Sequence, residues 1–301
     1  MTLLDPLSDS LADPLADRLL RGSARQSYDV DVDVDWSAPP VEGLWWMQPE
    51  RVSLYGTRLW DGLSEEQRIT LSMHEIGSIA SVGVWFEIVL MRLLLREVYD
   101  RDPRGSWAQY ALTEVGDETR HVVMFGRALG TMGVPAYGPR PEARVVARFT
   151  QPAIRDASFY SLVLVGEEPV DRWQRDLMRD ERIQPLVRMV ARIHVLEEAR
   201  HVSFAREELA KAVRDLGRTK RRWHQHVTAQ AAYLMMRSLV NPEAYRAVGI
   251  DPAEGRRAAL ANESYRETIH WMGEKMMPFL EEQGMVNPGD RKLWRASFLI
   301  R

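Results

Sequence analysis

The sequence lacks cysteine altogether. This absence excludes disulfides, zinc–thiolate sites and iron–sulfur clusters, and it leaves histidine and carboxylate side chains as the only strong metal ligands. The formal net charge of −3 gives no reason to expect a nucleic acid or an anionic membrane as a partner. The chain also lacks an uncharged apolar run near the length of about 18 residues that indicates a membrane helix, and its acidic N-terminus lacks the basic segment of a signal peptide. We therefore expect a soluble, cytoplasmic protein with no nucleic-acid or membrane partner.

Strand signals are scarce as well, so the sequence predicts an all-α protein. We interpret residues 51–301 as a single helical domain and residues 1–50 as an N-terminal arm. In the arm, residues 29–34 alternate Asp and Val as a strand would. We interpret this stretch as an acidic surface segment over the helices, with a cation or partner site as the alternative. Four leucines of the arm also have helical spacing: Leu4, Leu7, Leu11 and Leu15. Pro6 and Pro14 interrupt this pattern.

The expected helices of the domain have recognisable ends. Ser64 and Gln67 form a capping-box pair at the start of the first helix, and the same spacing recurs at Ser106 and Gln109. Residues 133–150 contain three prolines and are expected to form the long connection that a ferritin-like fold needs between its two helix pairs. The helices are expected over residues 64–99, 106–130, 154–178, 183–214, 221–240 and 262–282, with a short one after Asp251-Pro252.

Two copies of one short motif indicate a metal site. They read Asp117-Glu118-Thr119-Arg120-His121 and Glu197-Glu198-Ala199-Arg200-His201. In each copy a Glu and a His lie three residues apart, side by side on one helix face. Each also has a carboxylate upstream at the same distance, because 118 − 87 = 31 and 198 − 167 = 31. Four helices that contribute Glu, Glu-x-x-His, Glu and Glu-x-x-His are the ligand pattern of a dinuclear iron or manganese site in a ferritin-like bundle.

The two upstream carboxylates lie in apolar runs. Glu87 is the only acid between Glu75 and Glu97, and a buried carboxylate is costly unless it is paired or binds a metal. The alternative is a buried Glu neutralised by Arg92 or Arg120. Glu167 follows a similar run, but the adjacent Glu168 could be the ligand instead. Pro169 makes a kink or bulge possible there, which would shift the helical phase.

Further side chains fit around this site. Asp117 and Glu197 could each accept the free ring N–H of the opposite motif's histidine; the alternative for Glu197 is a surface ion pair. His194 lies four residues before Glu198 on the same face, and we favour it as a metal ligand over a core histidine. Four Glu carry −4, which two divalent ions balance, and oxidation of both ions would leave a positive centre suited to meeting dioxygen.

At this point the chain resembles the p-aminobenzoate N-oxygenases of the aureothin type. These are non-haem di-iron arylamine oxygenases of about this length with a ferritin-like core. The resemblance covers residues 64–214 by motif, and His194 matches the place of an extra histidine ligand in that family. It implies two irons, homodimers and a ligand set of four Glu and three His: Glu87, Glu118, His121, Glu167, His194, Glu198 and His201.

We therefore expect a ferritin-like helical bundle with extra C-terminal helices that acts as a non-haem di-iron oxygenase. Iron is expected, manganese is the alternative, and dioxygen is the co-substrate. The resemblance implies oxidation of an (aryl)amine nitrogen to hydroxylamine or nitro. One alternative is hydroxylation, desaturation or cleavage of a carrier-bound or lipid-like substrate, and another is a ferritin-like iron-handling protein. A radical-generating reductase is disfavoured because Phe125 stands where that family has its tyrosine.

Two expectations concern binding partners. A small-molecule substrate would enter a pocket closed by the C-terminal helices, with candidate lining residues Tyr233, Met235, Met236, Trp271, Met272 and Met276. An external electron donor, a ferredoxin or a reductase, would supply electrons. The basic cluster at residues 218–222 is interpreted as a solvated turn, with a docking patch for that donor as the alternative.

Overall fold

Helices make up most of the computed structural model, which describes residues 11–301. Leu4, Leu7 and Pro6 lie outside the described residues. Between residues 11 and 301 no strand forms, and the only β-type pairing is an isolated bridge between Trp45 and Ile183. The all-α prediction is therefore confirmed. The α-helices are α1 Pro14–Arg25, α2 Arg58–Asp61, α3 Glu65–Tyr99, α4 Ser106–Met132, α5 Pro141–Thr150, α6 Asp156–Leu177, α7 Pro185–Ala212, α8 Arg218–Met236, α9 Pro252–Ala261, α10 Glu263–Gly273, α11 Met276–Glu282 and α12 Arg291–Ala296, and the short 3₁₀ segments are η1 Pro49–Arg51, η2 Gln151–Ala153, η3 Pro242–Val248 and η4 Pro288–Asp290.

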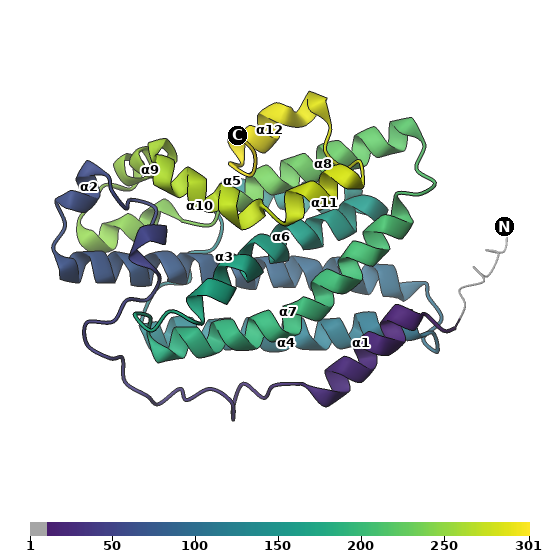
Figure 1. The fold of residues 1–301 in the computed structure, drawn as a ribbon, viewed down its shortest axis with the longest axis horizontal. Helices are drawn as coiled ribbons and strands as arrows, with labels where there is room; N and C mark the ends of the chain where they lie inside the picture. Colours follow the sequence, from purple (N-terminus) through teal and green to yellow (C-terminus); the bar gives the residue numbers. More distant parts are fainter. Residues whose placement is uncertain (1–10) are drawn as a thin grey trace.

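The four long helices α3, α4, α6 and α7 form the bundle that positions the site. α3 packs against α4, α6 packs against α7, and the two pairs meet through α4 with α7 and α3 with α6. Figure 1 shows α3 and α4 running side by side along the length of the molecule, with α6 and α7 crossing them obliquely. The arrangement is that of a ferritin-like bundle, in which side chains from facing helices meet in the core.

Local sequence explains most helix ends. The predicted capping box at Ser64 and Gln67 is present at the start of α3. The matching prediction for α4 is wrong: Gly105 is the cap there, and the hydroxyl of Ser106 is hydrogen-bonded instead to Asp13 of the arm. α4 ends at Gly133, whose φ of 67° is readily adopted only by glycine.

Several boundaries differ from the sequence expectations. The connection at 133–150 contains helix α5, because Pro141 serves as a first helical residue rather than a breaker. The expected helix at 262–282 is two helices, α10 and α11, separated at residues 274–275. Arg218 begins α8, so the basic cluster forms the first turn of a helix rather than a loop. α6 is a continuous α-helix through Pro169, so the expected bulge is absent.

The strand-like alternation at 29–34 is also misleading. These residues form turns in which the amides of Val32 and Asp33 donate to the carbonyl of Asp29. Val30 and Val34 are buried while Val32 is exposed, and Asp31 forms an ion pair with Arg127 of α4. The segment is thus an acidic stretch laid over the bundle, as interpreted. The division of the chain into an arm at 1–50 and a domain at 51–301 stays a prediction.

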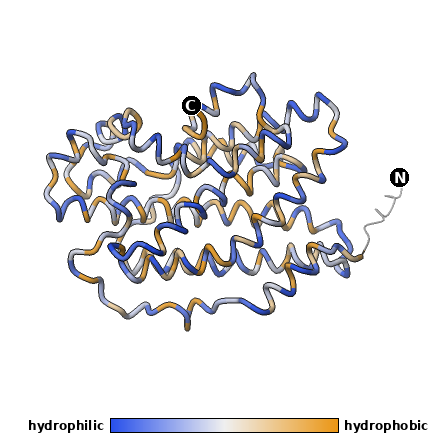
Figure 2. Tube along the Cα trace, viewed as in Figure 1, coloured by the Kyte–Doolittle hydropathy of each residue, from blue (hydrophilic) through white to orange (hydrophobic). Residues whose placement is uncertain are grey.

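The remaining helices cover the bundle on one side. α8, α10 and α11 pack against α6, and α12 packs against α8; Figure 1 shows them together above α6. Hydrophobic and hydrophilic residues alternate along most helices, as Figure 2 shows, which is the pattern of helices with one buried face. By length and composition alone α3 could cross a membrane, with half of its apolar window buried; in this structure it packs against α4 and α6.

Candidate metal centre

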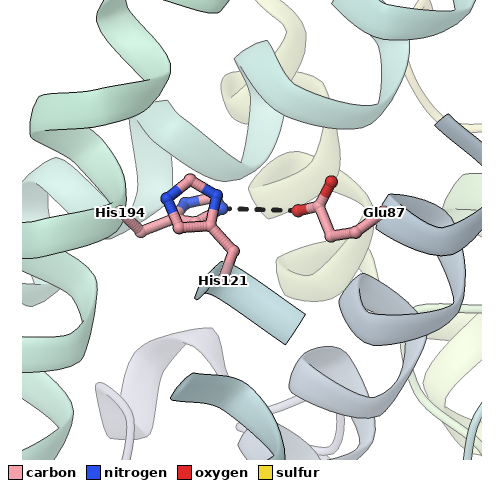
Figure 3. Close-up of side chains that lie close together, drawn as sticks. All are labelled: Glu87, His121 and His194. Carbon is pink, nitrogen blue, oxygen red and sulfur yellow. Dashed lines mark ion pairs between the residues drawn. The ribbon is translucent and has the colours of Figure 1, made fainter. Parts of the chain in front are cut away.

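All seven residues expected from the sequence meet at one place in the core of the bundle. Glu87 comes from α3, Glu118 and His121 from α4, Glu167 from α6, and His194, Glu198 and His201 from α7. Each of them is at most 2% exposed. They fall into overlapping groups of three, one of which also includes Glu114, and in each group one nitrogen or oxygen atom per residue lies within 4.8 Å of the others. Figure 3 shows the carboxylate of Glu87 directed at the rings of His121 and His194.

Glu118 and Glu198 lie between the two motif histidines. Glu118 Oε2 is 2.8 Å from Nδ1 of His121, and Glu118 Oε1 is 2.9 Å from Nδ1 of His201. Glu198 Oε1 lies 3.3 Å and 3.1 Å from the same two nitrogens. These two carboxylates therefore each contact both motif histidines, whereas Glu87 and Glu167 are each grouped with His194.

The outer nitrogens of the motif histidines are hydrogen-bonded across the helices, as the sequence predicts. His121 Nε2 lies 2.9 Å from Glu197 Oε2, and His201 Nε2 lies 3.2 Å from Asp117 Oδ2. Both carboxylates are buried, so Glu197 is not simply a surface ion pair. With Nε2 as the donor in each ring, Nδ1 is directed at Glu118 and Glu198 with its lone pair available.

Two arginines neutralise these outer carboxylates. Arg120 pairs with Asp117 and lies 3.4 Å from Glu197, while Arg200 lies 3.2 Å from Asp117 and 3.8 Å from Glu197. Although burial opposes it, the contacts with His201, Arg120 and Arg200 lower the pKa of Asp117 to about 2. The outer layer therefore has two negative and two positive charges and contributes no net charge toward the four central Glu.

His194 is oriented by a residue that the sequence pattern does not reveal. Its Nδ1 donates to Gln174 Oε1 on α6 at 2.7 Å. Its Nε2 then points toward the centre, 3.6 Å from Glu87 and 3.7 Å from Glu198. Burial lowers the pKa of His194 to about 4, so the ring is neutral near pH 7, as a metal ligand must be.

The residues present fit a pair of metal ions. Buried polar atoms in proteins are nearly always hydrogen-bonded, yet Glu87 Oε2, Glu167 Oε1, Glu198 Oε2 and His194 Nε2 are buried without a hydrogen-bond partner. Burial, reinforced by the neighbouring carboxylates, raises the pKa values of Glu87 and Glu167 well above the ordinary value. Two divalent cations would satisfy these atoms and balance four carboxylates.

The upstream carboxylates and the alternatives considered for them have different contacts in the structure. Glu87 has neither arginine as a partner, since Arg92 is exposed and Arg120 pairs with Asp117 and Glu197. Glu167 is directed into the cluster. Glu168 instead forms an ion pair with Arg206 of α7.

Glu114 is a second residue that the sequence expectations omit. It lies one helical turn before Glu118 on α4 and is grouped with Glu118 and His201 within ligand distance. Burial raises its pKa to about 8, and its Oε2 is also without a hydrogen-bond partner. A signal was available, because Glu114 has the same spacing to Glu118 (118 − 114 = 4) as His194 has to Glu198 (198 − 194 = 4).

A cavity of about 70 Å³ adjoins Glu87, Glu167 and His194. Most of its wall is hydrocarbon from α3, α4, α6 and α7, with Met235 from the end of α8 and Leu239 from the segment that follows it. Of the six lining candidates named from the sequence, Met235 lines this cavity and Met272 lines a smaller one beside it; Tyr233, Met236, Trp271 and Met276 line neither. Phe125, which replaces the radical tyrosine of reductases, is part of the wall, 5.0 Å from the ring of His194.

Comparison with known proteins identifies a family for the chain. A family model described as "P-aminobenzoate N-oxygenase AurF" matches residues 10–284. Two similar proteins are the uncharacterized protein Rv0885 of Mycobacterium tuberculosis (strain ATCC 25618 / H37Rv) and the uncharacterized protein MT0908 of M. tuberculosis (strain CDC 1551 / Oshkosh). Each is 28% identical over 307 residues, covering 97% of this chain and 88% of the relative.

Solved structures with a similar chain course include two point mutants of an R2-like ligand-binding oxidase with Mn/Fe cofactors. The mutant whose cofactor was reconstituted anaerobically has a TM-score of 0.47 and 14% identity, covering 97% of this chain and 92% of that one. The mutant whose cofactor was reconstituted aerobically has a TM-score of 0.45 and 15% identity, covering 97% and 94%.

Proposed function

The chain belongs to the p-aminobenzoate N-oxygenase family, and from that membership and the buried cluster we propose that it oxidises the nitrogen of an arylamine. At the coarser level it is a dioxygen-dependent oxidoreductase with a di-metal cofactor. The observation that carries the proposal is the set of four Glu and three His, each at most 2% exposed, beside a hydrocarbon cavity.

We propose Glu87, Glu118, His121, Glu167, His194, Glu198 and His201 as the ligands of two irons, with manganese as the alternative. When bound and reduced, the two ions supply the electrons and open coordination positions with which dioxygen is activated. The ligand set supports iron or manganese because it contains only carboxylate and imidazole donors.

The protein's own side chains have three tasks in such a reaction. Asp117, Glu197 and Gln174 hold the three imidazoles in fixed tautomers, so that Nδ1 of His121, Nδ1 of His201 and Nε2 of His194 stay available. The cavity wall excludes water from the side where Glu87 and Glu167 meet it. The same wall would hold the ring of a substrate with its nitrogen toward the centre.

The proposal extends to the partners of the enzyme. N-oxygenation needs an external electron donor, a ferredoxin or a reductase, and the exposed Arg218, Lys220 and Arg222 at the start of α8 support docking of an acidic protein. We also propose a homodimer in the cytoplasm. Exposed apolar side chains on the neighbouring helices α3 and α4, among them Ile88, Leu95, Leu112 and Val123, support a partner subunit on that face.

The test is metal analysis followed by turnover. Protein produced with ample iron should hold about two irons per chain, as expected for four Glu with two Glu-x-x-His motifs. After reduction and exposure to ¹⁸O₂, 4-ethylaniline should gain labelled oxygen on nitrogen, detected by mass spectrometry as the hydroxylamine or nitro compound. A protein that loads only one zinc would overturn the site, and label found only on carbon would overturn N-oxygenation.

Two neighbouring carboxylates provide a matched control. Glu167→Gln should lower the iron content and abolish turnover, because it removes a charge from the cluster. Glu168→Gln should retain both irons, because Glu168 faces Arg206. The reverse result would mean that Glu168 is the ligand.

A further inference from the structure

The described wall of the cavity contains no charged side chain other than the candidate metal ligands. Apart from Glu87, Glu167, His194 and Gln174, every described lining residue is aliphatic, aromatic, methionine or glycine, and none is Lys or Arg. The one other polar atom belongs to Trp173, whose indole N–H already donates to Gln48. The oxygen of Gln174 accepts the hydrogen bond from His194.

Three arginines of the surrounding helices and of η1 are already engaged. Arg120 and Arg200 pair with Asp117 and Glu197 on the far side of the motif histidines. Arg51 lines a smaller cavity that shares Ile79, Trp173 and Leu239 with the first. Its guanidinium lies 4.0 Å above the ring of Trp271 and donates to Thr268.

With two divalent ions bound, the centre would be neutral. Four ionised Glu give −4 and two divalent ions give +4, while the two outer carboxylates are balanced by two arginines. An anion or a cation in the cavity would therefore find neither a counter-charge in the wall nor a net charge at the metals.

From this lining we propose that the substrate is uncharged and apolar along its whole length: an arylamine that bears neither a carboxylate nor an alkylammonium group. The inference rests on the proposed function for the presence of the arylamine nitrogen, and on the cavity alone for the absence of charge. An arylamine is neutral near pH 7 because its lone pair is delocalised into the ring. An alkylamine is protonated there, as lysine is.

The cavity also limits the shape of the substrate. Its volume of about 70 Å³ admits at least about five water-sized groups, close to the six carbons of one benzene ring. Val187, Val190 and Ala191 on α7 and Phe86 on α3 surround this space. A small alkyl substituent on the ring would contact hydrocarbon, whereas a carboxylate in the same place would lose its water without gaining a partner.

Calorimetric titration of the iron(II)-loaded protein without dioxygen measures this preference, because no turnover takes place. The ligands are 4-ethylaniline, its isomer 2-phenylethylamine and 4-aminobenzoate. We expect 4-ethylaniline to bind at least about 100-fold more tightly than either charged compound, as unpaired charges are excluded from hydrocarbon. Binding of 4-aminobenzoate as tight as that of 4-ethylaniline would overturn the proposal, and so would the absence of binding by 4-ethylaniline.

Variants locate the binding. Val190→Phe adds bulk to the cavity wall one helical turn from His194 and should weaken 4-ethylaniline binding at least about tenfold. Val202→Phe on the same helix lies outside the cavity and should bind like the unmutated protein. Equal effects of both would overturn the placement. If 4-aminobenzoate binds and Arg51→Met abolishes that binding, the anion reaches the second cavity and the proposal is wrong.

A fourth ligand separates this inference from the proposed function. 4-Ethyltoluene has the size of 4-ethylaniline but no nitrogen. If it binds equally well, the uncharged class of substrate is supported, and the case for nitrogen as the oxidised atom is weakened. If 4-ethylaniline binds but is not oxidised on nitrogen, the proposed reaction fails while the binding preference stands.

Discussion

Loading the metal-free protein with two divalent ions should release about four protons at pH 7. Two of them come from Glu87 and Glu167. Burial, together with neighbouring carboxylates, raises the pKa of each of these acids well above its ordinary value of 4.5. We therefore expect both acids to hold a proton in the metal-free cluster, and both must release it to bind a metal.

The other two protons come from the motif histidines. Although burial opposes it, hydrogen bonds with Glu118, Glu197 and Glu198 raise the pKa of His121 well above 6.5. Glu198 and Glu118 similarly raise the pKa of His201 against the effect of burial. In return, their contacts with these histidines lower the pKa values of Glu118 and Glu198, which are therefore already ionised.

The count is thus two protons from Glu and two from His, or 2 + 2 = 4. Since four protons replace two divalent ions, the core has the same net charge with and without metal. The number is measured by calorimetric titration with iron(II) or manganese(II), free of dioxygen, in buffers of different ionisation enthalpy. The slope of the heat against buffer enthalpy gives the protons released.

Variants make this test specific. His194→Ala should still release about four protons. The pKa of His194 is lowered to about 4, so its ring is already neutral at pH 7 and contributes none of the released protons. Glu87→Gln should release about three. A value near zero for the unmutated protein would refute the charge argument. A fifth proton would mean that Glu114, with a pKa of about 8, also ionises when the metal binds.

Two further predictions concern single residues. Gln174→Leu leaves the Nδ1–H of His194 buried without an acceptor, so the metal-free protein should lose about 1–3 kcal/mol of unfolding free energy and its metal affinity should fall about 10–100-fold; unchanged denaturation and affinity would contradict the hydrogen bond. Burial raises the pKa of Glu75 from 4.5 to about 7. The folded state therefore keeps a proton that the unfolded chain loses, and stability falls by about 3 kcal/mol between pH 4.5 and 7. Glu75→Gln should remove this part of the pH dependence in denaturant titrations, and an unchanged slope would refute it.

The sequence predicts the parts of the fold that depend on local chemistry. The start of α3 is predicted because a capping box needs only neighbouring residues. The meeting of the seven candidate ligands is predicted because each helix repeats the same spacing. Prediction fails where the local structure depends on a distant part of the chain. The alternation at 29–34 would form a strand only beside a partner strand. Ser106 does not cap α4 because its hydroxyl is hydrogen-bonded to Asp13 of the arm.

Other failures arise from signals with two meanings. Pro141 suggests a loop when the sequence is considered alone, but proline is equally suited to the first turn of a helix. The break between α10 and α11 follows Gly273, and Pro278 has no N–H to donate to the carbonyl of Glu274 four residues earlier. Gln174 could not be predicted. It contacts His194 in the folded protein but lies 20 residues away in the sequence, and a single uncharged amide gives no periodic signal.

The position of the cavity also follows from a comparison between the two halves of the bundle. An offset of 80 residues carries Glu87 to Glu167, Glu118 to Glu198 and His121 to His201. The same offset carries Trp107 and Tyr110 of α4 to Val187 and Val190 of α7. On α4 the two aromatic rings pack on Phe204, with ring centroids 5.7 Å and 4.7 Å away, and fill the space beside the centre.

On α7 the corresponding valines are smaller, and the cavity lies there. The offset of 80 residues also carries Phe86 to Gly166, so a large side chain again corresponds to a small residue. A Cβ at Gly166 would lie 2.1 Å from the ring of Phe86. The glycine therefore allows this ring to form part of the cavity wall. The ligands of the two halves are nearly equivalent, and the residues behind them are not. The repeated motif therefore accounts for the metal pair, and the substitution of valine for tryptophan and tyrosine accounts for the side on which a substrate can approach it.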